Sequence, residues 1–570
     1  MGKTKETNTE LLKKEKIQTY TYDEVLSSSI KYFNGDELAA TTWMNKYAMK
    51  DFNDNYVEQN PSDMHRRMAK EFGRIEGDYK LKYNLNGSAK FLSEYGQKRE
   101  HLSEGRIFDL FENFGYIIPQ GSVMSSLGNT YKIASLSNCI VVPEMHDSYG
   151  GVFYTDQQLA QLFKRRCGVG VDISNLRPSG SQVSNAAGTT SGAVSFMKRF
   201  SHTTREVAQN GRRGALMLSM DIAHPDVEAF TTIKQDLSQV TGANISLRLS
   251  DEFMSAVEKN KEYTHKWPIN SDNPKFTKTV NARELWDTII KCAHNTAEPG
   301  LIFWDRQHWY STSSVYPGYE NTSTNPCSEI AMQGGDSCRL IAINLFNFVE
   351  NPFTKDAKFL MEDFYKATYE GQRLMDDLVD LETEAIGRIL AKIDTDNEPD
   401  EIKAVEKETW ELLLKTGIEG RRTGLGFTAL ADMVAALGMA IDREGINDVL
   451  QGGLGTPIYQ ELMGPKFPGW DPSRTVTAAA IKGYHDKYGG TDWVEYDVPA
   501  AEPDYKWPWK IPTDLTEAGR LLDLAGYPKG SDGVRFEIKM NKYRCETGDV
   551  CLEQADAVAA GWEELGVKTT

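Results

Sequence analysis

The sequence predicts an α/β fold for its central part, because short apolar runs of strand length alternate there with amphipathic segments of helix length. Before about residue 100 the chain is rich in charge and shows helical spacing only. Beyond about residue 438, glycine, proline, tryptophan and tyrosine become frequent. We therefore predict a helical N-terminal region (1–100), a central α/β domain (101–437) and a separate α+β C-terminal piece (438–570).

The elements follow from periodicity, taken in chain order. Apolar residues recur at helical spacing in 38–47 and 64–79, which predicts N-terminal helices there. The expected strands of the central domain are Ile133–Leu136, Cys139–Val142, Val169–Ile173, Leu216–Met220 and Asn244–Leu249. The expected helices between and after them are Gln157–Arg165, Pro225–Lys234, Asp251–Glu258 and Ala282–Asn295. Such alternation is typical of a parallel sheet, and periodicity does not decide between an open sheet and a barrel.

The later part of the chain is expected to be more helical. Two long amphipathic helices are predicted at 359–390 and 401–415. A glycine-bearing turn at 421–427 should lead into a helix that ends near Leu437. A helix–turn unit and one strand are expected in the C-terminal piece, at 515–530 and 534–540.

Composition limits the classes of function. The formal net charge of −18 argues against a protein that binds nucleic-acid backbones, which needs a basic face. The first residues are polar and charged, unlike a secretory signal, and no run of about 18 apolar residues occurs. We expect a cytoplasmic protein without nucleic-acid or membrane partners.

Three of the seven cysteines have an unusual context. Cys327 lies in Asn325-Pro-Cys-Ser-Glu-Ile330, Cys338 follows eleven residues later, and Cys139 lies on an upstream predicted strand. If 325–329 is extended, Asn325, Cys327 and Glu329 point to one face and bring an amide, a thiol and a carboxylate together. The alternative is a buried structural cysteine beside a turn-forming Asn–Pro, and Cys167 and Cys292 are interpreted as structural in the same way.

The Asn-Pro-Cys-Ser-Glu segment resembles the active-site finger loop of ribonucleotide reductase large subunits. Further segments resemble the same family in the same order along the chain. They are Gly121-Ser-Val-Met, Ser135-Leu-Ser-Asn-Cys, Lys164 to Ile173, Asn175-Leu-Arg-Pro-Ser-Gly, Gln209 to Ala215, His224-Pro-Asp, Asn244-Ile-Ser, Glu298-Pro-Gly and Gly424-Leu-Gly. The ordered set is specific, and it covers roughly residues 100–437.

The resemblance implies a ten-stranded α/β barrel with the finger loop threaded through its middle. It implies that Cys327 forms a thiyl radical that abstracts the 3′ hydrogen of the ribose. Glu329 would take the 3′ hydroxyl proton, and Asn325 would hydrogen-bond the ribose hydroxyls. Cys139 and Cys338 would be the reducing pair that ends as a disulfide, which requires Cα atoms within about 7 Å.

Two glycine-rich segments, 168–172 and 178–192, are interpreted as loops whose N–H and hydroxyl groups suit phosphate. The alternative for such a segment is an ordinary turn. Within the resemblance, Gln209, Arg212 and Arg213 belong to the loop that links an allosteric site to the substrate base. Asp147 and the Ser179-Gly180 pair are further candidate contacts of an effector nucleotide.

The radical generator is inferred separately. The sequence lacks HExxH, CxxC and the carboxylate–histidine spacing of a di-iron bundle, so we expect no metal ligands in this chain. The short gap between Cys327 and Cys338 resembles the adenosylcobalamin-dependent class. The alternative is a radical supplied by a separate metal-containing small subunit. The resemblance also implies a ribonucleotide di- or triphosphate substrate, a nucleoside triphosphate effector, a thioredoxin- or glutaredoxin-type reductant and a homodimer.

After Gly424-Leu-Gly-Phe the family's phosphate loop and last barrel strands are not found, so the barrel is expected to be incomplete. Residues 440–570 resemble a fragment of an oligopeptide-type solute-binding protein of ABC transporters instead. We therefore hypothesise a fused or misassembled chain. Cys545 and Cys551 fit this fragment better than a redox-active tail pair. The alternatives for the chain's function are nucleotide binding without catalysis, or a peptide- or solute-binding module.

Overall fold

The computed structural model describes residues 18–85, 101–207, 214–354 and 356–437, together with two short strands at 536–538 and 567–569. The chain divides into two compact units, Met1–Gly438 and Met439–Thr570. In the second unit β16 (Phe536–Ile538) pairs in parallel with β17 (Val567–Thr569), so the strand expected near 534–540 is confirmed. The helix–turn expected at 515–530 lies outside the described residues. The domain boundaries at residues 100 and 437 stay a prediction.

The N-terminal region is helical, as predicted. Its helices are α1 (Tyr22–Tyr32), α2 (Glu37–Lys46) and α3 (Pro61–Leu85). Thr21 and Glu24 form a capping box that starts α1, and Asp36 caps α2 by accepting a hydrogen bond from Ala39 N. These short-range polar contacts explain where the two helices begin.

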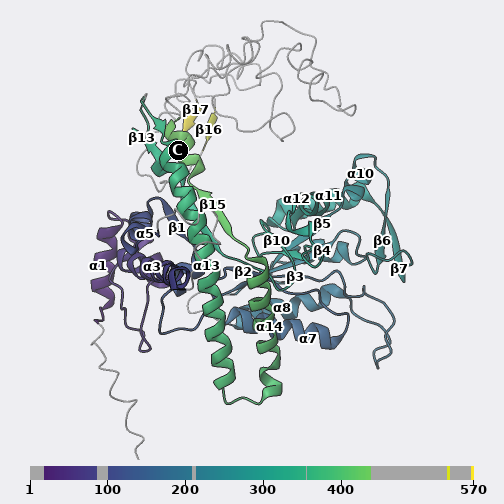
Figure 1. Cartoon of the computed structure of the whole chain (residues 1–570). Coiled ribbons are helices and arrows are strands. Elements are labelled where there is room, and N and C mark those ends of the chain that lie inside the picture. The colour runs from purple at the N-terminus through teal and green to yellow at the C-terminus, as the bar shows by residue number, and fades with distance from the viewer. Residues whose placement is uncertain are drawn as a thin grey trace, which may run out of the picture. The chain divides into compact units, whose positions relative to one another are not determined.

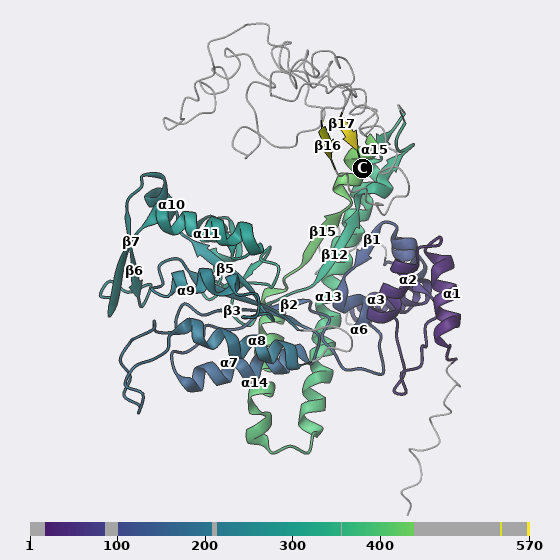
Figure 2. The same ribbon diagram turned by 180° about the vertical axis from the view of Figure 1, so that it is seen from behind.

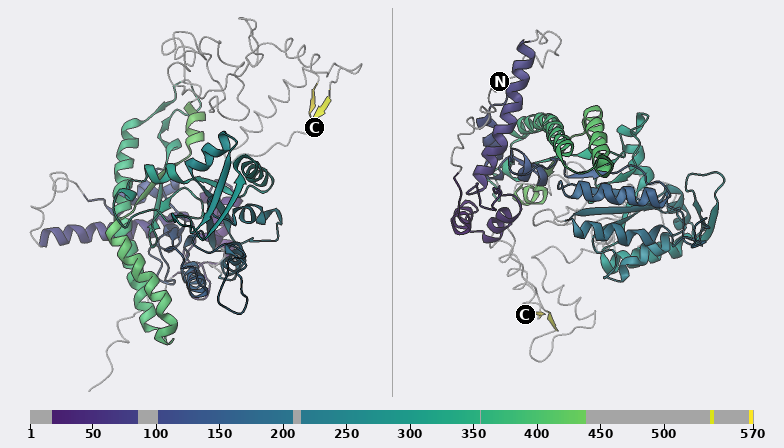
Figure 3. Two further views of the ribbon diagram at one scale, coloured as in Figure 1. Left: turned by 90° about the vertical axis from the view of Figure 1, so that its right-hand side faces the viewer. Right: turned by 90° about the horizontal axis from the view of Figure 1, so that it is seen from below.

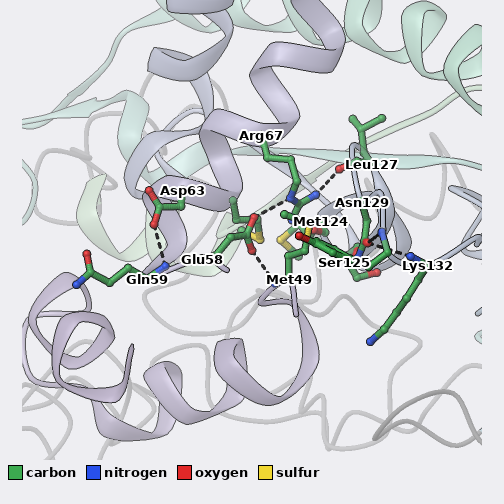
Figure 4. Close-up of polar contacts among 12 residues, drawn as sticks. Met49, Glu58, Gln59, Asp63, Arg67, Met124, Ser125, Leu127, Asn129 and Lys132 are labelled. Atoms are coloured by element: carbon green, nitrogen blue, oxygen red, sulfur yellow. Dashed lines mark hydrogen bonds and ion pairs between the residues drawn. The ribbon is translucent and has the colours of Figure 1, made fainter. Parts of the chain in front are cut away.

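A buried ion pair attaches the N-terminal region to the next part of the chain. Arg67 Nε donates to Glu58 Oε1 at 2.6 Å, and both side chains are almost fully buried (Figure 4). The remaining donors of Arg67 reach the carbonyl oxygens of Met124, at 2.8 Å, and Leu127. Met49 N donates to Glu58 at 2.7 Å. Removing either charge would leave the other buried without an opposite charge, which is far more costly than losing a surface ion pair.

The central domain contains a six-stranded sheet in the order β11-β2-β3-β4-β5-β8. Five strands run parallel, and β11 lies antiparallel at one edge. The strands are β2 (Cys139–Val141), β3 (Gly168–Asp172), β4 (Ala215–Asp221), β5 (Asn244–Leu249), β8 (Gly300–Phe303) and β11 (Ser337–Cys338). The central strands β3, β4 and β5 are buried almost throughout, as expected for parallel strands covered on both faces.

Helices cover this sheet on both sides. In Figure 1, α7 and α8 lie on one side and α10, α11 and α12 on the other, and Figure 2 shows the same layers from behind. The helices are α7 (Tyr149–Phe163), α8 (Ala193–Glu206), α9 (Val227–Thr232), α10 (Asp251–Glu258), α11 (Ala282–Thr296) and α12 (Trp304–Tyr310). A hairpin of β6 (Glu262–Trp267) and β7 (Phe276–Asn281) extends between α10 and α11. This layering confirms the predicted α/β class.

A second sheet has three strands in the order β1-β12-β15. They are β1 (Ile117–Pro119), β12 (Leu340–Asn344) and β15 (Gly424–Thr428), and only Arg339 separates β11 of the first sheet from β12. The long helices α13 (Met361–Thr395) and α14 (Asp400–Gly420) lie side by side against the domain (Figure 3). Helices α5 (Glu104–Phe111), α6 (Gly121–Ser126) and α15 (Leu430–Leu437) and the short pair β13 (Val349–Glu350) and β14 (Lys358–Phe359) complete the described part. Both sheets are open among the described strands.

Three local expectations were wrong. The segment 133–136 is irregular and is held by side chains instead of a neighbouring strand. The expected turn at 421–427 contains strand β15, whose parallel pairing with β12 is a long-range contact. The glycine-rich segment 168–172 is the buried strand β3 and not a phosphate loop.

Two large apolar clusters hold the first unit together. One lies between the six-stranded sheet and its helices and includes Phe163, Val171 and Phe230. The other joins the N-terminal helices to α13 through residues such as Phe72 and Leu374. Among the described residues, no helix has the length and apolarity needed to cross a membrane.

Candidate active site

Cys139 and Cys338 are direct cross-strand neighbours. Cys139 opens β2, Cys338 closes β11, and the two are Cα partners in the antiparallel ladder. Such partners have Cα atoms about 4.5–5.5 Å apart, which lies inside the range that a disulfide bond needs. Both thiols are buried and neither is in a disulfide. Gly424 of β15 leaves room for them, because a Cβ there would lie 2.9 Å from Cys338 Sγ.

The finger segment approaches this pair from a short hairpin. Strand β9 (Ser323–Thr324) pairs with β10 (Ala331–Met332), and the turn between them holds Asn325, Cys327 and Glu329. Asn325 is fully buried, and its Nδ2 donates to Cys139 Sγ at 3.6 Å. Its Oδ1 accepts from Ile330 N at 3.0 Å. Asn325 therefore connects the finger segment to the cysteine pair.

The geometry of the turn differs from the extended segment that we expected. Ser328 N donates to Asn325 O at 3.0 Å, and Ser328 has a φ of 71°. The chain thus reverses between Asn325 and Ile330, so strand alternation does not apply. Asn325 points inward, while Cys327 and Glu329 are exposed at the tip. The expectation that all three side chains share one face was wrong for this reason.

Glycines in β3 allow the finger segment to lie directly on the sheet. A Cβ at Gly170 would come within 1.8 Å of Thr324 O, and one at Gly168 within 3.0 Å of Pro326 Cγ. From β5, Asn244 Nδ2 donates a hydrogen bond to Pro326 O at 3.1 Å. Gly168 and Gly170 are therefore required by close packing and not by phosphate.

A buried charged cluster lies under the base of the finger segment. Arg248 of β5 contacts Asp172 at the end of β3 (3.3 Å) and Asp221 at the end of β4 (3.1 Å). Its Nη1 donates to Thr322 O at 3.0 Å. Ser219 Oγ donates to Asp172 at 2.8 Å and lies 2.9 Å from Ser323 Oγ. The cluster thus links three parallel strands to the finger segment.

The surroundings of Cys338 and Cys327 raise the pKa of both thiols. Burial, with a smaller contribution from Cys139, raises the pKa of Cys338 to about 12. The pKa of Cys327 is also raised, first because its surroundings remove part of its water and second because of the charge of Glu329. A protonated thiol retains the hydrogen atom that a thiyl radical mechanism must exchange.

We expect the alkylation rate of Cys338 to keep rising with pH well above pH 9, where the rate of an ordinary thiol levels off. The folded form retains its proton up to about pH 12, whereas the unfolded chain loses it near 9.0. The contribution of Cys338 to folding stability is therefore fully present below pH 9.0 and is lost as the pH rises from 9.0 to about 12. With iodoacetamide, the logarithm of the rate at Cys338 should rise linearly through pH 10 and 11, about tenfold per unit. A plateau near pH 9, as in the urea-unfolded chain, would contradict the expectation.

The expected effector residues lie in several places. Asp147 precedes α7 and binds Arg177, whose Nε donates at 2.8 Å. The N–H groups of Ser179 and Gly180 are used by Asp226 and Thr190 O, so a phosphate could not take either without displacing its partner. Gln209, Arg212 and Arg213 lie outside the described residues.

A hollow of about 340 Å³ lies beside Ser179 at the start of α8. Its polar lining comes from Ser179, Ser191, Ser195, Gln239, Lys198 and the carboxylate of Asp226, and its apolar lining comes from Val194, Ala229 and Ile233. The N-terminus of α8 faces this region, although Asp226 already accepts the N–H of Ala193 at 3.0 Å. The hollow offers contacts for a polar ligand through side chains, with Lys198 as its cation.

Sequence reasoning missed two groups of functional side chains. Asp172 and Asp221 end parallel strands, a position where ligands and charges commonly gather, so their positions carried a usable signal. Glu382 of α13 is buried against the segment before β2, and nothing in its local sequence pattern indicates this contact.

Among the described residues, no group of three or more potential metal ligands is found.

A family model described as "Ribonucleotide reductase, barrel domain" matches residues 137–451, more than half of the chain. A second model, "Bacterial extracellular solute-binding proteins, family 5 Middle", matches residues 431–570. Both resemblances inferred from the motifs are therefore confirmed. The two matches overlap at residues 431–451, where the composition changes near residue 438.

Individual relatives agree with the match to the ribonucleotide reductase family. A vitamin B12-dependent ribonucleoside-diphosphate reductase of Thermoplasma acidophilum is 31% identical over 430 residues, 69% of this chain and 51% of the relative. A protein of the same description from Mycobacterium tuberculosis is 30% identical over 342 residues, 60% of this chain and 44% of the relative. A ribonucleoside-diphosphate reductase large chain of Neurospora crassa is 25% identical over 433 residues, covering 70% and 42%. The chain thus spans about half the length of the curated relatives it matches.

Proposed function

Because the chain belongs to the ribonucleotide reductase family through its barrel domain, we propose that it is a catalytic chain that reduces ribonucleoside di- or triphosphates to deoxyribonucleotides. The observation that carries this proposal is the pairing of Cys139 with Cys338 beneath Asn325 of the finger segment. Two thiols that can close a disulfide supply the two electrons that the reaction consumes. The ribose loses its 2′ hydroxyl as water and gains hydrogen, while the thiol pair becomes a disulfide.

In this proposal Cys327 is the hydrogen-atom carrier. Its protonated thiol, once converted to a thiyl radical, takes the 3′ hydrogen of the ribose and later returns it. Glu329, two residues away at the same exposed tip, accepts the proton of the 3′ hydroxyl. Asn325 holds the sugar against the cysteine pair, which its amide already contacts.

We propose adenosylcobalamin as the radical source, since the relatives of T. acidophilum and M. tuberculosis are described as vitamin B12-dependent. When bound, this group supplies a carbon-centred radical that can take the hydrogen of a thiol. One feature of the described residues fits it: Cys327 is exposed, so its thiol is accessible to a bound cofactor. The alternative remains a separate metal-containing subunit that generates the radical.

The proposed partners are an effector nucleotide, a second copy of the chain and a protein reductant. An effector nucleotide is proposed to bind near Asp147, Ser179 and Gly180, where the hollow with Lys198 offers a cation for phosphate. Exposed Tyr149 and Phe153 stack on each other along α7, which supports an apolar contact with a second copy in a homodimer. A thioredoxin- or glutaredoxin-type protein is the proposed reductant of the Cys139–Cys338 disulfide.

The deciding experiment is reduction of CDP and CTP by the purified full chain, with dithiothreitol and effector nucleotides, with and without adenosylcobalamin. Formation of dCDP or dCTP that requires the cobalamin is the expected result, measured by chromatography of the nucleotides. Binding of effector nucleotide without turnover under both conditions would contradict catalysis by this chain alone. It would favour a chain that has kept nucleotide binding only.

The family match over residues 431–570 favours a second candidate function, binding of a solute such as a peptide. Isothermal titration of the full chain with an oligopeptide mixture tests it. Heat of binding that persists when the nucleotide sites are saturated is the expected result. Absence of binding heat would leave the C-terminal piece without this function.

A further inference from the structure

A buried carboxylate on α13 holds the residues that lead into β2. Glu382 is 1% exposed and accepts three hydrogen bonds. The donors are Ser135 Oγ at 2.5 Å, Leu136 N at 2.6 Å and Ser137 Oγ at 2.9 Å. A buried carboxylate with this many donors holds its partners strongly, because hydrogen bonds to a charged group are stronger than neutral ones.

This anchor acts on the irregular segment that leads into β2, before the ladders with β3 and β11 begin. The segment 132–138 is irregular, and Cys139 is the first residue of the strand. Apart from Glu382, backbone bonds such as Ser135 N to Arg165 O (3.2 Å) and Asn138 N to Cys338 O (3.1 Å) hold it. The face that Cys139 presents therefore depends on how residues 135–137 are held.

A third thiol lies close to the pair but on the opposite face of the sheet. Cys167 immediately precedes Gly168, the residue opposite Cys139 in the parallel ladder. Cys167 packs in the cluster that contains Ile140, whereas Cys139 packs with Val141 and Cys338. Burial and then the charge of Glu382 raise the pKa of Cys167, so Glu382 also opposes the thiolate that would be needed for exchange with Cys139.

We propose that Glu382 is a positioning residue for the cysteine pair. By fixing residues 135–137 it holds Cys139 opposite Cys338 and away from Cys167, and so selects the disulfide that forms. The inference rests on the proposed function, in which Cys139 and Cys338 are the reductant. It adds a residue from a different part of the chain that the motifs did not identify.

The chemical step can be followed without nucleotide reduction. Oxidised glutathione is the two-electron oxidant: the Cys139 and Cys338 thiols lose their hydrogens, the sulfur–sulfur bond forms, and two molecules of reduced glutathione leave. The full chain is equilibrated in glutathione mixtures of defined ratio, quenched in acid and alkylated. Peptide mass mapping then gives the fraction of each cysteine pair that has formed a disulfide.

The test variant is Glu382→Gln, which keeps the shape but removes the charge, so the hydrogen bonds to residues 135–137 become neutral and weaker. We expect the equilibrium constant for the Cys139–Cys338 disulfide to fall about tenfold, the equivalent of one good hydrogen bond. Appearance of a Cys139–Cys167 disulfide in this variant would be further support. An unchanged equilibrium constant would overturn the proposal.

Two controls separate positioning from loss of stability. Glu384 lies two residues further along α13 and pairs with Arg74 at the surface. Glu384→Gln removes this charge and should leave the equilibrium constant of the Cys139–Cys338 disulfide unchanged. Ile389→Val shortens a fully buried side chain of the same helix and serves as a destabilised reference. If Ile389→Val lowered the constant as much as Glu382→Gln at equal loss of melting temperature, the effect would be general and the proposal wrong. If the chain failed to reduce CDP yet Glu382→Gln alone shifted the disulfide equilibrium, the proposed function would fail while this inference stood.

Discussion

Cys327→Ser is expected to lower nucleotide reduction by at least about a thousandfold, more than any other single substitution in the site. The hydroxyl of serine occupies nearly the same space, but its O–H bond is much stronger than a C–H bond of ribose. The radical therefore cannot be generated at this position and returned. Effector binding should stay near normal, because Cys327 lies at an exposed tip and not in the core. The measurement is dCDP or dCTP formation, with nucleotide binding by calorimetry on the same sample.

A matched cysteine provides the control for this variant. Cys292→Ala removes a buried thiol of α11 that takes no part in the proposed chemistry, and should retain most of the activity. Turnover retained in Cys327→Ser would remove Cys327 from the mechanism. Loss of effector binding together with activity would show that the substitution had disturbed the fold.

Arg248→Met is expected to cause the largest loss of stability. The substitution removes the shared partner of Asp172 and Asp221 and leaves two carboxylates close together in a largely buried place. Breaking a buried ion pair on one side typically costs about 3–5 kcal/mol, and we expect a loss of about that size in the unfolding free energy of β4 and β5. Burial already raises the pKa of Asp221, against the opposing effect of Arg248, so this carboxyl should take up a proton in the variant. The finger segment should loosen too, since Thr322 O loses its donor.

Hydrogen exchange followed by mass spectrometry suits this measurement, because it reports local opening in a chain of two units. Arg306→Met is the control, since its ion pair with Asp251 is exposed and should be worth less than about 1 kcal/mol. Asp172→Asn in the Arg248→Met background should restore part of the lost protection by removing one uncompensated charge. A loss below about 1 kcal/mol in Arg248→Met would contradict the role assigned to the buried cluster.

Much of the fold could be predicted because its signals are local. The strands at β3, β4 and β5 and the helices α10, α11, α13 and α14 appear where apolar spacing indicated them. Local signals failed where a distant partner decides the conformation. Strand β15 was interpreted as a turn because its two glycines resemble turn residues, yet β12 pairs with all five of its residues. Residues 133–136 have a strand-like pattern but are held by Glu382.

The candidate site divides in the same way. The chemistry proposed for Cys327, Cys139 and Cys338 comes from the family resemblance of their motifs, which the sequence carries in the order of its residues. Alternation could not predict the reversal at Ser328, since its φ of 71° is imposed by the turn. Asp172, Asp221 and Arg248 converge only because three parallel strands end together.

The sequence by itself determined the α/β class, the order of most elements and the family, and it named the residues proposed to carry thiyl radical chemistry, because these depend on local periodicity and on motifs. Only the tertiary structure decided that Cys139 faces Cys338, that Asn325 contacts Cys139 and that Glu382 anchors the segment leading into β2. These contacts join residues far apart in the chain. They depend on strand register and helix docking, which the burial of the whole core selects and which no short stretch of sequence encodes.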